Sequence, residues 1–101
     1  MIRDNVIQKL KESKRFLQDN FGVKEIGLFG SYAKNDFTDA SDIDIYIECD
    51  IERLTYDKYF ELIEFLEKEF GKKIDIITKG GIQTIRIPEV QMKIKDSIVY
   101  V

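Results

Sequence analysis

The spacing of apolar residues predicts three helices along the chain. Residues 2–20, 55–70 and 88–96 carry apolar side chains three or four positions apart, the period of an amphipathic helix. Thr55 is a fair N-cap for the second helix, and Gly71 suits the position just past its end. We expect the inner faces of the first two helices at Val6, Leu10, Ser13 and Leu17 and at Tyr59, Ile63, Leu66 and Phe70.

A different period predicts the strands. In residues 43–48 isoleucines alternate strictly with Asp, Tyr and Glu, which is typical of a half-buried strand. Residues 25–29 and 73–77 are short apolar runs that predict two more strands, and residues 98–101 form an apolar tail that is a final strand or a docking segment. Gly80–Gly81 predicts a turn. The order of elements predicts the α/β class, with one mixed sheet flanked by helices.

Length and composition describe one small domain, residues 1–101. Of its 101 residues, 44% are hydrophobic and 35% are charged, so the chain can bury a core and stay soluble. The net charge of −3 disfavours sequence-independent nucleic-acid binding, which needs a basic surface. The first residues lack the apolar region of a signal peptide, and no apolar run approaches membrane-spanning length. We therefore expect a cytoplasmic protein without a membrane partner or a nucleic-acid partner.

The chain has no histidine and a single cysteine, Cys49. Catalysis by Ser-His-Asp or Cys-His arrangements is therefore excluded, and so are histidine-rich zinc sites. We expect Cys49 to be a small packing residue that forms no internal disulfide. Acid–base or metal chemistry must then come from carboxylates, lysines or tyrosines.

Three aspartates lie where carboxylates have little structural use. Asp42 and Asp44 are two residues apart at the start of a strand, where their side chains would share one face and repel each other without a cation between them. Asp75 interrupts an apolar strand, where a carboxylate is costly without a partner or a metal. If the two strands pair, the three carboxylates form one site for two metal ions, and magnesium prefers such oxygen ligands. Alternatively, Asp42 is a loop residue, Asp44 an exposed strand residue and Asp75 a surface residue of an edge strand.

Gly30 and Ser31 follow a predicted strand and lead into a predicted helical turn at residues 31–34. A glycine lets a phosphate approach the backbone closely, and a serine at a helix start offers a hydroxyl and N–H groups. Taken alone, the pair also fits an ordinary strand-to-helix turn with Ser31 as the N-cap. The turn, the two aspartates near 43–48 and the third aspartate together indicate metal-assisted transfer from a nucleoside triphosphate.

Residues 30–35 (Gly-Ser-Tyr-Ala-Lys-Asn) and 41–45 (Ser-Asp-Ile-Asp-Ile) resemble the signature of the polymerase-beta-like nucleotidyltransferases. The chain is similar to their shortest branch, the minimal nucleotidyltransferases, which are often antitoxins paired with HEPN-domain toxins. The resemblance extends over nearly the whole chain, including residues 94–100. It implies the polymerase-beta-like nucleotidyltransferase fold and a toxin as partner, in a hetero-complex or an oligomer.

The resemblance also implies roles for the residues of the motif. ATP would be the donor, AMP the transferred group, and a tyrosine hydroxyl of the toxin the acceptor. Asp42, Asp44 and Asp75 would hold two Mg²⁺ ions, and Asp75 would help to deprotonate the acceptor. The nucleotide would be bound by Gly30, Ser31, Lys34 and Ser41. The family commonly has arginine and glycine where this chain has Lys34 and Asn35, so a bidentate guanidinium is replaced by a single ammonium group.

The sequence leaves two other functions open. The first is an antitoxin that neutralises its partner by contact alone, through an interface such as the apolar tail at residues 98–101. The second is adenylyl transfer to an RNA end or a small molecule, which the acidic balance and the lack of a second domain disfavour. A variant without the carboxylates that still neutralised its partner would separate contact from catalysis.

Overall fold

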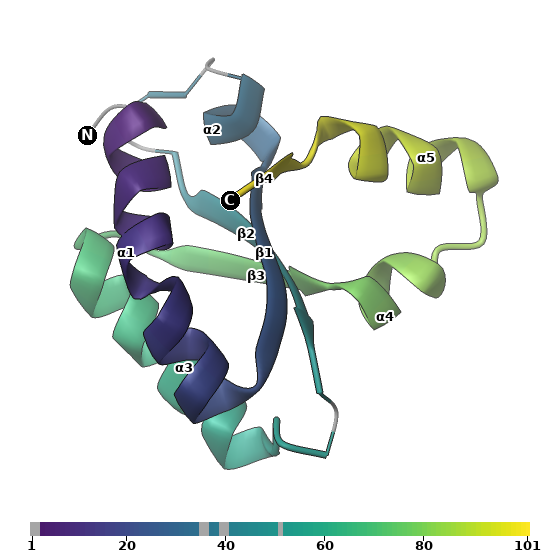
Figure 1. Ribbon diagram of the computed structural model, residues 1–101. Coiled ribbons are helices and arrows are strands. Elements are labelled where there is room, and N and C mark those ends of the chain that lie inside the picture. Colours follow the sequence, from purple (N-terminus) through teal and green to yellow (C-terminus); the bar gives the residue numbers. More distant parts are fainter. Residues whose placement is uncertain (1–2, 35–36, 39–40, 51) are drawn as a thin grey trace.

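Helices and strands alternate along residues 3–34, 37–38, 41–50 and 52–101, the part of the chain that the computed structural model describes (Figure 1). In chain order the elements are α1 (Arg3–Phe21), β1 (Val23–Phe29), α2 (Gly30–Lys34), β2 (Ile43–Cys49), α3 (Tyr56–Phe70), β3 (Ile74–Thr78), α4 (Lys79–Gln83), α5 (Pro88–Ser97) and β4 (Val99–Tyr100). The predicted helices and strands are confirmed, with boundaries shifted by a residue or two. Asn35, the last residue of the predicted motif at residues 30–35, lies outside the described residues.

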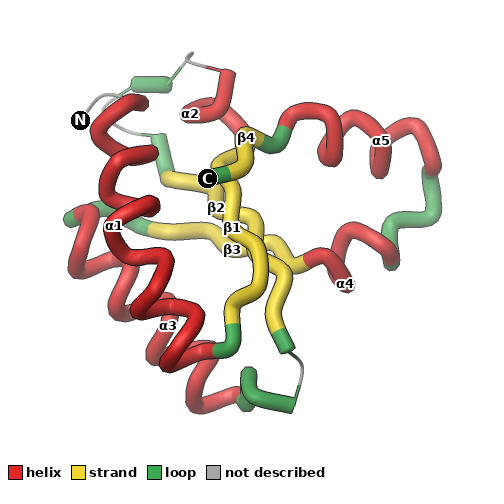
Figure 2. The backbone as a smooth tube through the Cα atoms, viewed as in Figure 1, coloured by secondary structure: helices red, strands yellow, loops and turns green. Residues whose placement is uncertain are grey.

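A mixed sheet organises the described residues, with the strand order β3-β2-β1-β4. Strand β1 runs antiparallel to β2 and β4, whereas β2 runs parallel to β3. Helices α1 and α3 lie side by side on one face of the sheet, and α4 and α5 lie on its other side (Figures 1 and 2). The predicted α/β class is therefore confirmed. Within the described segments, no helix combines the length and the apolar character that crossing a bilayer requires.

The main core lies between the sheet and helices α1 and α3. Ile43, Ile45 and Ile47 of β2 are fully buried there, as their strict alternation predicts. Burying three such side chains contributes about 1.5–3 kcal/mol each. The two helices add Val6, Leu10 and Leu17 from α1 and Leu62, Leu66 and Phe70 from α3.

The predicted inner face of α3 is partly wrong. Leu66 and Phe70 are buried as expected, but Tyr59 and Ile63 are only half-buried and Leu62 is fully buried in their place. Helix α3 packs against α1 as well as against the sheet. The buried face of α3 is therefore turned toward α1. Sequence spacing alone does not predict this rotation, because the rotation depends on which element packs beside the helix.

The second face of the sheet is also covered, and this changes the environment of Tyr46. The alternation predicts Tyr46 on a polar face, yet its side chain is only 4% exposed and packs with Ile82 and Ile98. Ile82 belongs to α4, a short helix that replaces the predicted turn at Gly80–Gly81. This helix forms despite its glycines because the Thr78 hydroxyl caps it, accepting from the N–H of Gly81 at 3.0 Å.

The apolar tail completes the sheet. Strand β4 pairs with β1, and the N–H of Val101 donates to the carbonyl of Ile26 at 3.0 Å. The Lys14 ammonium donates to the Val101 carbonyl at 2.9 Å, and Ile98 is buried beneath α5 and α4. Of the two interpretations of residues 98–101, the final strand is therefore confirmed.

Thr55 is the N-cap of α3, as predicted. Its hydroxyl accepts from the N–H of Lys58 at 3.3 Å. We expect Thr55→Ala to lower the free energy of unfolding by about 1 kcal/mol, because one N–H of the first turn loses its partner. Urea unfolding measures this, with Thr55→Ser as the control that keeps the hydroxyl. Equal unfolding midpoints for the alanine and serine variants would contradict the cap.

Candidate functional site at the start of β2 and β3

The turn between β1 and α2 brings the backbone against a carboxylate. Gly30 begins α2 with a φ of 71°, in the left-handed region that favours glycine. The preceding residue, Phe29, is paired with Asp44 of β2. A Cβ atom added at Gly30 would overlap Oδ2 of Asp44. Glycine is thus needed both for the turn and for the close approach of the Asp44 side chain.

Asp44 and Asp75 are partners in the register of the parallel strands β2 and β3. Paired residues of neighbouring strands point to the same face, so both carboxyl groups stand on the face opposite the main core. Their side chains are close enough for Asp75 to raise the pKa of the Asp44 carboxyl group. The strand pairing on which the predicted three-carboxylate site depends is therefore present. The alternative interpretation of Asp75, a surface residue of an edge strand, also agrees with the structure, because Asp75 is exposed and β3 is at the edge of the described sheet.

The pKa of Asp44 is raised above its ordinary value of 3.8. Partial burial of the carboxyl group is the largest cause, followed by the negative charges of Asp75 and Asp42 and by the hydrogen bond with Asp75. Asp42 lies one residue before β2 rather than in it, which is the loop position of the alternative interpretation, and a shared face for Asp42 and Asp44 stays a prediction. Its charge still acts on Asp44, so all three carboxyl groups influence one position.

The chemistry of these three groups suits a magnesium ion. Mg²⁺ prefers carboxylate oxygens, and a cation at this position would offset the repulsion that raises the pKa of Asp44. As the side chains stand, however, no three Asp, Glu, Cys or His residues of the described segments are placed to hold one ion together. Binding by all three aspartates would require side-chain rotation. Their role as metal ligands stays a prediction.

The four residues predicted to bind the nucleotide differ in their surroundings. Gly30 and Ser31 form the first turn of α2, next to Asp44. Lys34 is exposed in the last turn of the same helix. The hydroxyl of Ser41 accepts from the N–H of Thr38 at 2.9 Å, two residues before β2 begins. Their contacts with a nucleotide stay predictions.

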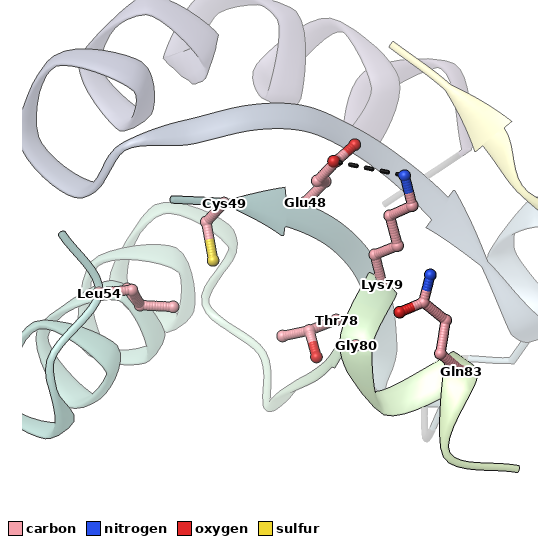
Figure 3. A pocket seen from close by; sticks show the side chains of 7 residues that line it. All are labelled: Glu48, Cys49, Leu54, Thr78, Lys79, Gly80 and Gln83. Carbon is pink, nitrogen blue, oxygen red and sulfur yellow. Dashed lines mark hydrogen bonds and ion pairs between the residues drawn. The ribbon is translucent and has the colours of Figure 1, made fainter. Parts of the chain in front are cut away.

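A cavity of about 420 Å³ lies at the opposite end of β2 and β3 (Figure 3). On its wall the Lys79 ammonium pairs with the Glu48 carboxylate at 3.4 Å. Glu48 follows Asp44 by four residues along the strand, or roughly 13 Å, so the cavity is separate from the three carboxylates. The sequence analysis missed this cavity, because the register that brings β2 and the end of β3 together is not visible in residue spacing. The other lining residues are Cys49, Leu54, Thr78, Gly80 and Gln83.

The fold and the carboxylate site together define a class of protein. A glycine turn leads a short helix past an aspartate of one strand, and a second aspartate stands beside it on the parallel neighbour. Residues 10–101 match the family described as "Nucleotidyltransferase domain". The chain belongs to this family, and it is a nucleotidyltransferase.

Named relatives cover most of the chain. A "Putative protein adenylyltransferase" of Methanocaldococcus jannaschii is 44% identical over 93 residues, which are 91% of this chain and 90% of that protein. "Protein adenylyltransferase MntA" of Thermococcus cleftensis is 36% identical over 75 residues, which are 74% of this chain and 75% of that protein. The chain thus resembles both relatives over most of their length.

Solved structures share the fold. One described as a "putative minimal nucleotidyltransferase" has a TM-score of 0.75 at 20% identity and covers 98% of this chain and 95% of its own. A mutant of the "toxin-antitoxin MntA-HpeT" has a TM-score of 0.60 at 18% identity and covers 99% of this chain and 71% of its own. The predicted minimal nucleotidyltransferase fold is therefore confirmed.

Proposed function

We propose that this chain transfers AMP from ATP, with Mg²⁺, to a tyrosine hydroxyl of a partner protein, and that the partner is a HEPN-type toxin. The observation that carries the proposal is the in-register pair of Asp44 and Asp75 beside the Gly30 turn. A protein acceptor is supported by relatives named as protein adenylyltransferases. A toxin partner is supported by the fold shared with the toxin–antitoxin structure.

Each residue of the site then has a chemical role. Mg²⁺ held by Asp42, Asp44 and Asp75 would neutralise phosphate charge and favour in-line displacement. The acceptor hydroxyl attacks the α-phosphorus of ATP, the bond from that phosphorus to the bridging oxygen breaks, and pyrophosphate leaves. The hydroxyl proton passes to Asp75, the exposed carboxylate of the pair. The backbone N–H groups of Gly30 and Ser31 face phosphate oxygens.

Lys34 and Ser41 support the nucleotide from the two ends of the loop before β2. The exposed Lys34 ammonium is free to turn toward the triphosphate as a single positive charge. The Ser41 hydroxyl, held by the Thr38 N–H, fixes the loop that leads to Asp42. Lys34 therefore acts on the nucleotide directly, and Ser41 positions the first aspartate.

A second function, neutralisation of the partner by contact alone, is favoured by large apolar side chains on the surface. Tyr56 is 86% exposed and Phe60 is 60% exposed, although both lie on the same helix as the core residues of α3. Exposed apolar groups of this size commonly mark protein interfaces. A variant that lacks transfer and still neutralises the partner would support this function.

The proposal is tested with ATP labelled at the α-phosphate, added with Mg²⁺ to a lysate of the source organism. We expect the wild type to label a product that the Asp42→Asn/Asp44→Asn double variant does not label. Protease should destroy the product and nuclease should leave it intact. A product destroyed by nuclease would identify RNA as the acceptor instead. Equal labelling by the wild type and the double variant would contradict the catalytic site.

A further inference from the structure

Strand β3 has one open edge. Among the described strands it pairs only with β2, on one side. The N–H of Ile43 donates to the carbonyl of Lys73 at 3.1 Å, which fixes the alternation of the parallel ladder. The main-chain groups of Asp75 therefore point toward β2, and those of Ile74 and Ile76 point toward the open edge. This edge can accept another strand.

Helix α3 lies on one face of the sheet, and one of its sides presents apolar residues above this open edge. Helix α1 packs on β1 and α3 packs on β3, so the side of α3 away from α1 lies above the open edge (Figure 1). The side toward α1 carries Phe65, whose ring stacks on Phe16 with centroids 4.6 Å apart, and Leu62 is buried in the core. The opposite side, by helical geometry, carries Tyr56, Phe60 and Ile63, which we name the α3 shelf.

The shelf is open to solvent. Tyr56 and Phe60 are 86% and 60% exposed, and Ile63 is half-buried. On the other face of the same strand, Asp75 is exposed next to Asp44. A strand added at the open edge would alternate between these two surfaces. Because Tyr56 and Phe60 belong to the start of α3 and Asp75 to the start of β3, alternate side chains would contact the shelf toward the Thr78 end of β3, and a side chain on the opposite face would stand beside Asp75.

We propose that an extended segment of the acceptor protein pairs with the open edge of β3 and so presents its hydroxyl to Asp75. The segment has a tyrosine on the carboxylate face, beside Asp75, and farther along it has apolar side chains at alternate positions on the other face, for the α3 shelf. Main-chain hydrogen bonds to Ile74 and Ile76 supply affinity, as in other cases of strand addition to a sheet edge. This inference rests on the proposed function, because it concerns how the acceptor reaches the same site.

Charge favours a partner over a second copy of this chain at the edge. Each chain carries a net charge of −3, and pairing of two β3 strands would bring two copies of Asp75 and its acidic neighbours together. Like charges on neighbouring strands destabilise the pairing. An acceptor strand without acidic side chains beside Asp75 avoids this repulsion.

Two variants test the shelf and the edge in the lysate assay. Tyr56→Ser/Phe60→Ser removes exposed apolar contacts, and Ile76→Pro removes an N–H that points away from β2. We expect each to lower transfer to the labelled protein about tenfold or more, and we expect Tyr56→Ser/Phe60→Ser to leave the affinity for Mg²⁺-ATP unchanged. Met92→Ser is the matched control, because Met92 is 61% exposed on α5, away from β3. It should transfer like the wild type.

A peptide probe tests the strand pairing with the unmodified protein. The peptide has valines alternating with threonines and a central tyrosine, and it is made in two N-methylated versions, each blocked on one alternate set of amides. Only one set faces β3, so we expect the two versions to differ about tenfold or more as acceptors. Equal labelling of both versions, together with wild-type transfer by Tyr56→Ser/Phe60→Ser, would overturn the inference and leave the proposed function intact. If the wild type labels neither protein nor peptide, the proposed function fails and the inference fails with it.

Discussion

Asp44→Asn is expected to lower nucleotidyl transfer by about a hundredfold or more while making the metal-free domain more stable. Transfer falls because the half-buried carboxylate at the centre of the site is replaced by a neutral amide that cannot balance a cation. Labelled transfer to the acceptor protein measures the first effect. Undiminished transfer by the variant would place the reaction elsewhere in the molecule.

The gain in stability follows from the raised pKa of Asp44. Folding favours the protonated carboxyl group, so the destabilising effect is absent below the ordinary pKa of 3.8, grows as the pH rises to the folded-state pKa, and stays constant above it. With EDTA present, the variant should melt above the wild type at about pH 7, and the difference should vanish at about pH 3. Glu64→Gln, an exposed change in the middle of α3, is the control. Adding Mg²⁺ should raise the melting temperature of the wild type only.

The second large effect is expected for Gly30→Ala. The added Cβ overlaps Oδ2 of Asp44, and the residue must also keep a φ of 71°. We expect a loss of about 1–3 kcal/mol in the free energy of unfolding from backbone strain, together with loss of transfer as the Asp44 carboxyl group is displaced. Thermal unfolding and labelled transfer measure the two effects.

Gly71→Ala separates strain from displacement. Gly71 has a similar φ of 63°, but a Cβ there meets nothing within 4 Å. This variant should lose about 1–2 kcal/mol of stability and keep transfer near the wild-type rate. If both glycine variants transferred equally well, the close approach of Gly30 to Asp44 would have no part in the reaction.

The parts of the fold that were predictable are those that rest on local periodicity. The alternating isoleucines of β2 define both the strand and its buried face, and Thr55 and Gly71 mark the ends of α3. The carboxylates of Asp44 and Asp75 were predictable as a pair on one condition, the pairing of β2 with β3. The periodicity of the sequence does not predict this pairing of β2 with β3, because strand order depends on contacts between distant segments.

The parts that were not predictable depend on tertiary packing. Tyr46 is buried because Ile82 and Ile98 cover a face that alternation marks as polar. The short helix α4 forms at two glycines because Thr78 caps it. Asp42 falls one residue before β2, since the strand begins only where Ile43 enters the core. Each of these features would require the sheet order before it could be derived.

The exposed position of Asp75 suits the protein acceptor that we propose. A carboxylate buried on a central strand would be reached only by a small nucleophile, whereas an exposed carboxylate on an edge strand is open to a side chain of another protein. The same edge is lined by the α3 shelf. In the proposed arrangement, catalysis and partner contact involve two surfaces along one strand, so variants of one surface are needed to separate its effect from that of the other.

The proposed transfer of AMP to a protein is tested most directly by the intact mass of the labelled acceptor protein after incubation with ATP, Mg²⁺ and the wild-type chain. We expect a mass increase of one AMP group or a whole number of them, located on a tyrosine and absent with Asp42→Asn/Asp44→Asn. A mass increase of a phosphoryl group, or an unmodified acceptor, would contradict nucleotidyl transfer to protein.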